Sequence, residues 1–476
     1  MTSSLQINDS PPLAAGRFNH TGVDLQRRVG LFPAANIVIA NMIGAGIFTT
    51  SGLIMAELKN PLLMLVLWAA GAVIALCGAL CYGELGAAMP EAGGEYYFLS
   101  RLYHPLAGFL SGWVSFVVGF SAPIAASSIG FSEYFLRAFP VLSEFAGSQA
   151  LVKKLLSLSV IALFTGIHIR GVERGLKVQN ALTLLKVGLI AGLILLGVFS
   201  GKGDFRHFSS GNGWSGGLAG FKTAGLSLMW ILFAYSGWNA STYIGSEIRN
   251  PERNLPLSLL AGTGVVAALY LCLNALYVYA VPPESMQGVV SVGGLAAGML
   301  FGRLAEVLFS LLIAFALFSS LSAFMILGPR VYYSMARDGC FFKVFSNVHP
   351  DLKIPRKAIV LQGLFSGCMV LSGTFDQILT YMGFSLGLFP IFTVFGMFKL
   401  RRLGRRGYRA PGHPLIELFY LLPCILVLIL AFMERPVSSS IALLTVTAGV
   451  PVYYLFFRSQ KAGPASPGPA DIKRNP

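Results

Sequence analysis

Charged residues are scarce in this chain. They make up 12% of its 476 residues, about half of the roughly 25% found in soluble domains. Hydrophobic residues make up 55%. Because soluble proteins need a polar and charged surface, this composition excludes an ordinary soluble domain. The sequence therefore predicts an all-α protein that crosses the membrane several times.

The chain also lacks the residue patterns of several other protein classes. Its six cysteines are scattered and most fall within apolar runs, so we expect small core residues rather than a disulfide framework or a metal site. The sequence contains no H-E-x-x-H segment, Walker loop or clustered Cys and His. Its basic residues form no stripe with interleaved aromatics. We therefore predict no enzyme, no cofactor, no metal and no nucleic-acid partner.

No cleavable signal sequence is predicted from the first residues. The first 28 residues are polar, and they contain no apolar core followed by small residues. We predict that residues 1–28 form a cytoplasmic tail and that the first apolar run is retained as a membrane helix. Residues 458–476, which contain several prolines, are predicted to form a disordered cytoplasmic tail.

Long apolar runs, by contrast, are abundant. Runs of about 20 residues predict 12 transmembrane helices. Helices 1–10 are expected to form a core over residues 29–400, and helices 11 and 12 to lie within residues 401–457. The stretch 284–300 is too short to span and is expected to form an outer loop with a short surface helix. The predicted helices lie near residues 30–54, 61–89, 105–137, 154–170, 178–200, 221–247, 255–281, 303–334, 357–373, 377–399, 415–433 and 437–457.

The distribution of positive charge predicts the orientation of these helices. If the N-terminus is cytoplasmic, 25 of the 35 Lys and Arg residues lie on the inner side and nine on the outer side, with Lys186 inside a helix. Inner loops of membrane proteins carry the excess of Lys and Arg. We therefore predict that both termini are cytoplasmic and that the protein resides in the cell membrane.

Two of the predicted helices, the first and the sixth, are interrupted by glycine at their centres. Residues 43–48 read IGAGIF and residues 233–238 read FAYSGW. An unwound helix frees backbone groups that lipid cannot satisfy, so such a break persists only where protein encloses a cavity. Corresponding breaks in two halves of a chain point to a transporter's binding site. We predict an inverted repeat of helices 1–5 and 6–10, with helices 11 and 12 appended.

Four motifs follow one another along the chain: IGAGIF, residues 82–85 with 89–97 after helix 2, FAYSGWN followed by residues 250–256, and residues 329–339 after helix 8. Together they resemble the motifs of amino-acid permeases in the amino acid-polyamine-organocation superfamily. The resemblance implies a LeuT-like fold and alternating-access transport of amino acids. It covers about the first 360 residues, and helices 9–12 match only in hydropathy.

The first break has the features of an anion site. Half-helix N-termini present free N–H groups and a positive dipole end, which suit a carboxylate. The resemblance implies that the backbone of this loop binds the substrate carboxylate. Many relatives have Ser or Thr where this chain has Ala45, so one hydroxyl contact is missing here. A glycine kink that serves only helix packing is the alternative. The loop residues are Ile43, Gly44, Ala45 and Gly46.

The second break is expected to serve the substrate's amino group. Unwound carbonyls of Phe233, Ala234 and Ser236 can accept hydrogen bonds from an ammonium group, and the resemblance implies that Phe233 lies over the substrate as a gate. Tyr235 is expected to be a packing aromatic. No Asp or Glu lies beside either break in the sequence, which favours neutral amino acids over polyamines or other amines.

Lys186 is the single charged residue in the predicted helix 178–200, where an unpaired charge costs at least about 2.5 kcal/mol. In related permeases a lysine here occupies the site where sodium-coupled relatives bind their ion. By resemblance, Lys186 bridges helix 1 near Gly44 to helix 8 and makes transport independent of sodium. It could also carry a proton, and a side chain that stretches to cytoplasmic water is the alternative. Helix 8 offers three serines for the contact: Ser319, Ser320 and Ser322.

Other charged residues are expected to hold structure rather than substrate. Glu84 and Glu247, at the inner ends of helices 2 and 6, are predicted to contact arginines such as Arg330. Arg303 and Glu306 lie about one turn apart at the outer start of helix 8, so we expect them to pair with each other.

The predicted function is secondary active transport of amino acids. Proton symport, exchange and uniport remain open, as do a polyamine or amine permease, a non-transporting amino-acid sensor and a channel. The predicted partners are an amino-acid substrate, a proton as a second candidate ligand, and the lipid membrane. No obligatory protein partner is expected, because no cysteine falls in an outer loop suited to an intermolecular disulfide.

Overall fold

The computed structural model of the chain is helical throughout most of its described length. Within the described ranges no strand occurs, and β-type pairing is limited to two isolated bridges, Val29 with Ile248 and Ala92 with Ile244. Most of both predicted tails lies outside these ranges, although α18 continues to Lys461. The described residues are 27–139, 141–142, 148–170, 172–210, 217–349, 354–372, 375–404 and 407–461.

The helices follow one another with mostly short connections. Up to residue 210 they are α1 (Leu31–Met42), α2 (Ala45–Leu58), α3 (Pro61–Ala88), α4 (Glu95–Leu102), α5 (Pro105–Val114), the π-helix η1 (Ser115–Gly119), α6 (Ser121–Ala138), α8 (Gln149–His168), α9 (Val172–Phe199) and the 3-10 helix η2 (Phe205–Phe208). From residue 217 they are α10 (Gly217–Tyr235), η3 (Ala240–Tyr243), η4 (Gly245–Glu247), α11 (Pro251–Ala280), α12 (Pro283–Met286), α13 (Val292–Phe301), α14 (Arg303–Arg337), η5 (Lys343–Phe345), α15 (Arg356–Ser372), α16 (Phe375–Arg402), α17 (Leu415–Glu434) and α18 (Pro436–Lys461).

Eleven helical segments within the described ranges are long and apolar enough to cross a membrane. They coincide with eleven of the twelve predicted helices. The remaining one, near residues 357–373, is α15, whose 17 residues are at the lower limit of a membrane span. A multi-pass helical membrane protein is therefore confirmed, whereas the twelfth span stays a prediction.

Both glycine breaks are present. The first membrane segment divides into α1 and α2, and the chain between them is extended at Gly44, with φ −108° and ψ −158°. The second break follows the end of α10, where Gly237 has a φ of +98°. A Cβ there would lie 2.4 Å from the side-chain nitrogen of Asn41. Glycine is therefore required at position 237 by both conformation and space.

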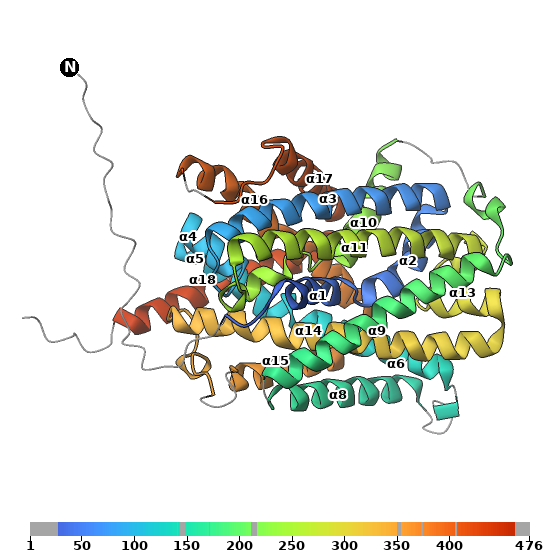
Figure 1. Cartoon of the computed structure of the whole chain (residues 1–476), viewed down its shortest axis with the longest axis horizontal. Coiled ribbons are helices and arrows are strands. Elements are labelled where there is room, and N and C mark those ends of the chain that lie inside the picture. Colours follow the sequence, from blue (N-terminus) through green and yellow to red (C-terminus); the bar gives the residue numbers. More distant parts are fainter. Residues whose placement is uncertain are drawn as a thin grey trace, which may run out of the picture.

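The broken helices lie inside the bundle. Figure 1 shows the long helices running roughly along the horizontal axis, with α1 and α2 near the middle of the picture. α1 packs against α11, α14 and α9, and α10 packs against α2, α3 and α17. A short helix was expected within 284–300 and is present as α13, but the expectation that it lies on the surface is wrong. α13 has buried residues along its length and packs on α14, because its glycines and alanines allow a close approach.

Candidate functional site

A frame of hydrogen bonds joins the two breaks. The hydroxyl of Tyr270 on α11 donates to the carbonyl of Met42 at 2.7 Å and to that of Ala234 at 3.1 Å. The side-chain amide of Asn41 donates to the carbonyl of Gly237 at 3.3 Å. Backbone carbonyls freed by unwinding are thus satisfied within the protein, as the low-dielectric surroundings demand. Sequence reasoning missed Tyr270 and Asn41, although a polar side chain in an apolar helix was an available signal.

The start of α2 has the geometry of an anion site. Gly44 is its N-cap residue, and no side chain caps the helix. The first N–H groups of any helix lack partners within it and carry the positive end of the dipole. The predicted cradle, residues 43–46, includes the N-cap and the first two residues of α2. These residues do not line the cavity described below, so their contact with a carboxylate stays a prediction.

Lys186 lies between the first break and α14. Its side chain is fully buried. The ammonium group donates to the carbonyl of Ile43, to that of Ala40 at 3.3 Å, and to the hydroxyl of Ser320 at 2.8 Å. Ser320 in turn donates to the same Ile43 carbonyl. The side chain therefore points to the break, and its amino group is hydrogen-bonded there by neutral oxygens.

The three serines predicted around Lys186 take different places. Only Ser320 contacts the lysine. The Ser319 hydroxyl lies 3.0 Å from that of Thr183 on α9, and Ser322 lies 2.9 Å from Nε2 of His168 on α8. Because the residues of an α-helix are about 100° apart, neighbouring serines face different helices. Sequence alone could not choose among them.

The carbonyls at the second break are partly engaged. The carbonyl of Phe233 accepts a hydrogen bond from the backbone N–H of Ser236 at 2.9 Å, and that of Ala234 accepts the Tyr270 hydroxyl. Each carbonyl oxygen has a second lone pair for a ligand. Tyr235 is a packing aromatic, as expected: its buried ring lies edge-on to Trp68, 5.6 Å between centroids.

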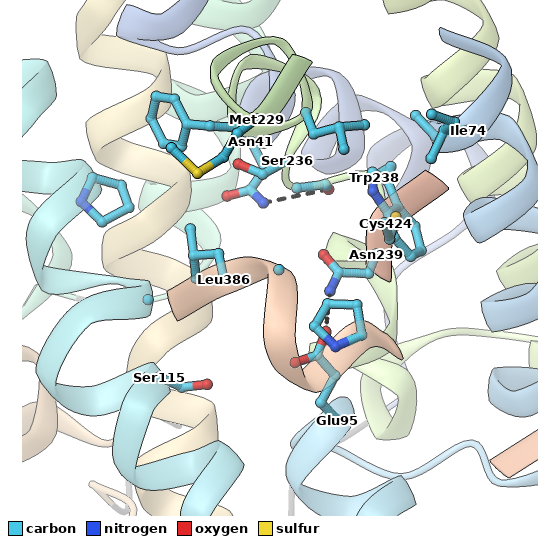
Figure 2. A pocket seen from close by; sticks show the side chains of 18 of the residues that line it. Asn41, Ile74, Glu95, Ser115, Met229, Ser236, Trp238, Asn239, Leu386 and Cys424 are labelled. Atoms are coloured by element: carbon cyan, nitrogen blue, oxygen red, sulfur yellow. Dashed lines mark hydrogen bonds between the residues drawn. The ribbon is translucent and has the colours of Figure 1, made fainter. Parts of the chain in front are cut away.

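A cavity of about 110 Å³ opens beside the second break. A cavity that holds a single water has a volume of only about 10–15 Å³, so this space suits a small solute. Its walls come from α1, α3, α4, η1, α6, α10, α14, α16 and α17 and from the segment after α10. Of the predicted site residues, Phe233 and Ser236 line it, whereas Ile43, Gly44, Ala45, Gly46, Ala234 and Lys186 do not. Figure 2 shows Asn41, Ser236, Asn239 and Glu95 around this space.

Glu95, the first residue of α4, places a carboxyl group on the cavity wall. Its Oε1 accepts hydrogen bonds from the Tyr82 hydroxyl at 2.7 Å and from the Asn239 amide at 2.8 Å. Burial raises the pKa of Glu95 to about 7, although these two hydrogen bonds lower it. No acid lies beside either break in the sequence, but the fold brings this one there. Sequence reasoning missed it because α4 is distant in the chain.

The chain also matches a known protein family. A family model described as amino acid permease matches residues 29–457. The chain belongs to this family. The resemblance found from the four motifs is therefore confirmed, and it extends over the C-terminal helices as well. Because the family and the related proteins are transporters, the permease is not an enzyme.

The permease is similar to three kinds of amino acid transporter. It is 29% identical to the b(0,+)-type amino acid transporter 1 of Mus musculus over 443 residues, which cover 91% of this chain and 88% of the relative. It is 28% identical to the large neutral amino acids transporter small subunit 2 of Rattus norvegicus, covering 94% and 84%. It is 29% identical to the serine/threonine exchanger SteT of Bacillus subtilis, covering 90% and 97%.

Ion pairs of the permease link the ends of its helices. Glu247 accepts from Arg330 at 2.7 Å, so the predicted contact is confirmed. Glu84 instead accepts from Arg401 at 2.5 and 2.9 Å. Both pairs are largely buried, so removing one partner leaves an uncompensated charge.

The expected pairing of Arg303 with Glu306 is wrong. Glu306 accepts from Arg137, the penultimate residue of α6, at 2.6 and 2.8 Å. Arg137 also donates to the hydroxyl of Ser291, which precedes α13. Spacing within one helix predicted a local pair, but the packing of α14 against α6 offers Glu306 a partner with several donors.

Proposed function

We propose that this permease is a secondary active transporter that carries amino acids across the cell membrane by alternating access, without sodium. The observation that carries the proposal is the ammonium group of Lys186, which donates to the Ile43 carbonyl at the first break and to Ser320. A fixed cation at that point can fill the structural role of a bound ion. The relatives, which are amino acid transporters and an exchanger, support the substrate class.

The proposed substrate site uses both breaks. The backbone N–H groups of Ile43, Gly44, Ala45 and Gly46 would bind the substrate carboxylate, as the uncapped start of α2 suits an anion. The carbonyls of Phe233, Ala234 and Ser236 would accept from the ammonium group, and the ring of Phe233 would cover the substrate. The close approach of Gly46 to Ala234 supports this, because it brings the two sets of groups together.

The proposed sodium substitute consists of Lys186 and Ser320, together with the neighbouring Ser319 and Ser322, which do not contact the lysine. A lysine at the junction of the first break and α14 supplies a positive charge and three donors, as a bound cation would supply charge and coordination. The burial of Lys186 supports the proposal, since a buried charge with ordered partners is expected to serve function rather than solubility.

The proposed architecture has 12 spans, with α15 as the ninth, and an inverted repeat of five helices that places both breaks at corresponding positions. We further propose that both termini are cytoplasmic and that the protein acts without an obligatory protein partner. The excess of Lys and Arg on one side supports the orientation.

The test is counterflow in proteoliposomes. Purified permease is reconstituted with unlabelled amino acid inside, and uptake of a panel of labelled amino acids is followed with sodium or choline outside, with and without a proton gradient. We expect counterflow of at least one neutral amino acid at equal rates in sodium and choline. A requirement for sodium would contradict the role of Lys186, and binding without counterflow would indicate a sensor instead.

A further inference from the structure

Glu95 is the acid of the cavity, and the function proposed above gives it no role. Figure 2 shows its side chain and that of Asn239 pointing toward one another at one end of the space. Only 6% of the residue is exposed. A carboxylate buried to this extent is costly unless a cation or several donors compensate it.

The immediate partners of Glu95 are uncharged. The hydroxyl of Tyr82 and the amide of Asn239 both donate to Oε1. That amide also donates to the Tyr243 hydroxyl at 3.2 Å, and Tyr420 lines the same cavity. No described residue donates a hydrogen bond to Oε2, and none forms an ion pair with Glu95. One oxygen of the carboxyl group is thus available to a ligand in the cavity.

In the described part of the chain, the helices α16 and α5, which pack against α4, form no ion pair with Glu95. On α16, Arg401 donates to Glu84, and the ammonium of Lys399 lies 5.8 Å from the centroid of a tyrosine ring. α5 carries no ionisable side chain. Neither helix therefore supplies a cation to Glu95.

On α14 and on α4 itself, the cationic groups named below also interact with groups other than Glu95. On α14, Arg330 pairs with Glu247, and at its end Asp338 accepts from the hydroxyl of Tyr96 at 2.7 Å. On α4 itself, the Arg101 guanidinium lies over a tyrosine ring, 5.1 Å from its centroid. Because no described residue forms an ion pair with Glu95, a bound ligand or a proton is the available source of positive charge for its carboxyl group.

We propose that Glu95 is a cation-accepting site of the transport cavity, which takes one positive charge into the loaded permease: a proton when the substrate side chain is neutral, or the ammonium or guanidinium group of a cationic side chain. This inference rests on the proposed transport function and specifies the substrate class and the coupled ion. The chemistry common to both sources is a hydrogen-bond donor with a single positive charge at Oε2.

The proton step balances at one atom. While the cavity faces one side, hydronium gives its proton to Oε2, an O–H bond forms and water is released. After the cavity opens to the other side, that O–H bond breaks and water takes the proton back as hydronium. The raised pKa of Glu95, about 7, allows both steps near neutral pH. A cationic side chain makes the proton unnecessary, because it neutralises the carboxylate directly.

The experiment measures both sources of charge in proteoliposomes. Uptake of a neutral amino acid is followed from pH 5.5 to 8.5, and uptake of labelled arginine at pH 8. In the wild-type protein we expect neutral uptake to fall as pH rises through about 7. In Glu95→Gln we expect the pH dependence to disappear and arginine uptake to fall at least about tenfold relative to neutral uptake. If only the pH dependence is lost, the result supports the proton as the charge that Glu95 accepts. If only arginine uptake falls, it supports the cationic side chain.

Two further variants keep the test independent of folding defects. Tyr82→Phe removes a hydrogen bond that stabilises the carboxylate, so the midpoint of the pH profile is expected to move up by about one unit. Tyr82 acts here as a positioning residue, and a merely structural role would not move that midpoint. Glu91→Gln is the matched control: Glu91 is exposed in the same segment and does not line the cavity, so its profile is expected to match the wild type.

The outcomes separate this inference from the proposed function. If Glu95→Gln keeps both the wild-type pH profile and wild-type arginine uptake, or if Tyr82→Phe leaves the midpoint in place, the assignment of Glu95 is overturned while amino acid transport stands. If the wild-type protein shows no counterflow of any amino acid, the proposed function fails and this inference fails with it.

Discussion

Gly46 on α2 and Ala234 on α10 touch each other through their backbones. A Cβ added to Gly46 would lie 2.8 Å from both Cα and Cβ of Ala234, closer than two carbon atoms approach without repulsion. The two broken helices thus meet directly at their breaks. This contact brings the proposed carboxylate-binding loop close to the carbonyls proposed to bind the substrate's ammonium group.

Substitution of Gly46 tests that contact. In Gly46→Ala the added methyl group must push α2 from α10, at a cost of about 1–3 kcal/mol, so we expect lower thermal stability and at least a severalfold loss of uptake. Gly188→Ala is the matched control, because nothing lies within 4 Å of a Cβ at that position on α9. Fluorescence-detected size exclusion after heating measures stability. Equal behaviour of the two variants would contradict the close contact.

Tyr270 is expected to stabilise both breaks through its hydroxyl. Tyr270→Phe removes the hydrogen bonds to Met42 and Ala234 and leaves buried carbonyls with one partner fewer, so we expect destabilisation of about 1–3 kcal/mol. Tyr277→Phe, two turns later on α11, is the control: it is equally buried, and its hydroxyl has no partner among the described residues. Thermal unfolding of both variants, together with uptake, measures the difference. The same loss in both would show that ring burial, not the hydroxyl, matters.

Lys186 is expected to be essential for transport. Lys186→Ala leaves the Ile43 carbonyl without its cation, and we predict a loss of uptake of at least about tenfold, with or without a pH gradient. Ser320→Ala should reduce uptake more than Ser319→Ala, because only Ser320 contacts the lysine. Uptake per folded protein is the measurement. Wild-type transport in Lys186→Ala would remove the lysine from the mechanism.

Phe233 is expected to act as a gate. In Phe233→Ala we predict strongly slowed uptake with expression and folding retained, since the ring lines the cavity and is only partly buried. Phe199→Ala is the control, because that ring is 84% exposed at the end of α9. Initial rates of uptake, normalised to monodisperse protein, compare the two. Unchanged rates in Phe233→Ala would contradict the gate.

The stability of the folded protein is expected to fall as pH rises toward neutrality. The pKa of Glu95 is raised from 4.5 to about 7, so the folded state holds a proton that the unfolded state has already released between these values. The contribution of Glu95 to the free energy of unfolding is therefore greatest below about pH 4.5. It decreases by up to about 3 kcal/mol as the pH rises to about 7. Glu95→Gln should flatten the profile of melting temperature against pH over this range. An identical slope in wild type and variant would assign the pH effect to other groups.

Part of the candidate site was readable from the sequence. IGAGIF and FAYSGW predicted both helix breaks, because glycine at the centre of an apolar run acts locally on the backbone. Lys186 was identified because a charged side chain in an apolar helix is energetically costly and therefore indicates a specific role. In contrast, the partners of Glu306 and the selection of Ser320 were not readable, since they depend on how α14 faces α6 and α9.

The sequence by itself determined the membrane class, eleven of the spans, the two breaks and the family, because hydropathy, glycine and short motifs act over neighbouring residues. Only the tertiary structure decided that Glu95 lies on the cavity wall beside Asn239 and that Tyr270 holds both breaks together. These groups come from helices far apart in the chain. Their meeting is set by helix packing, which joins residues that no local pattern connects.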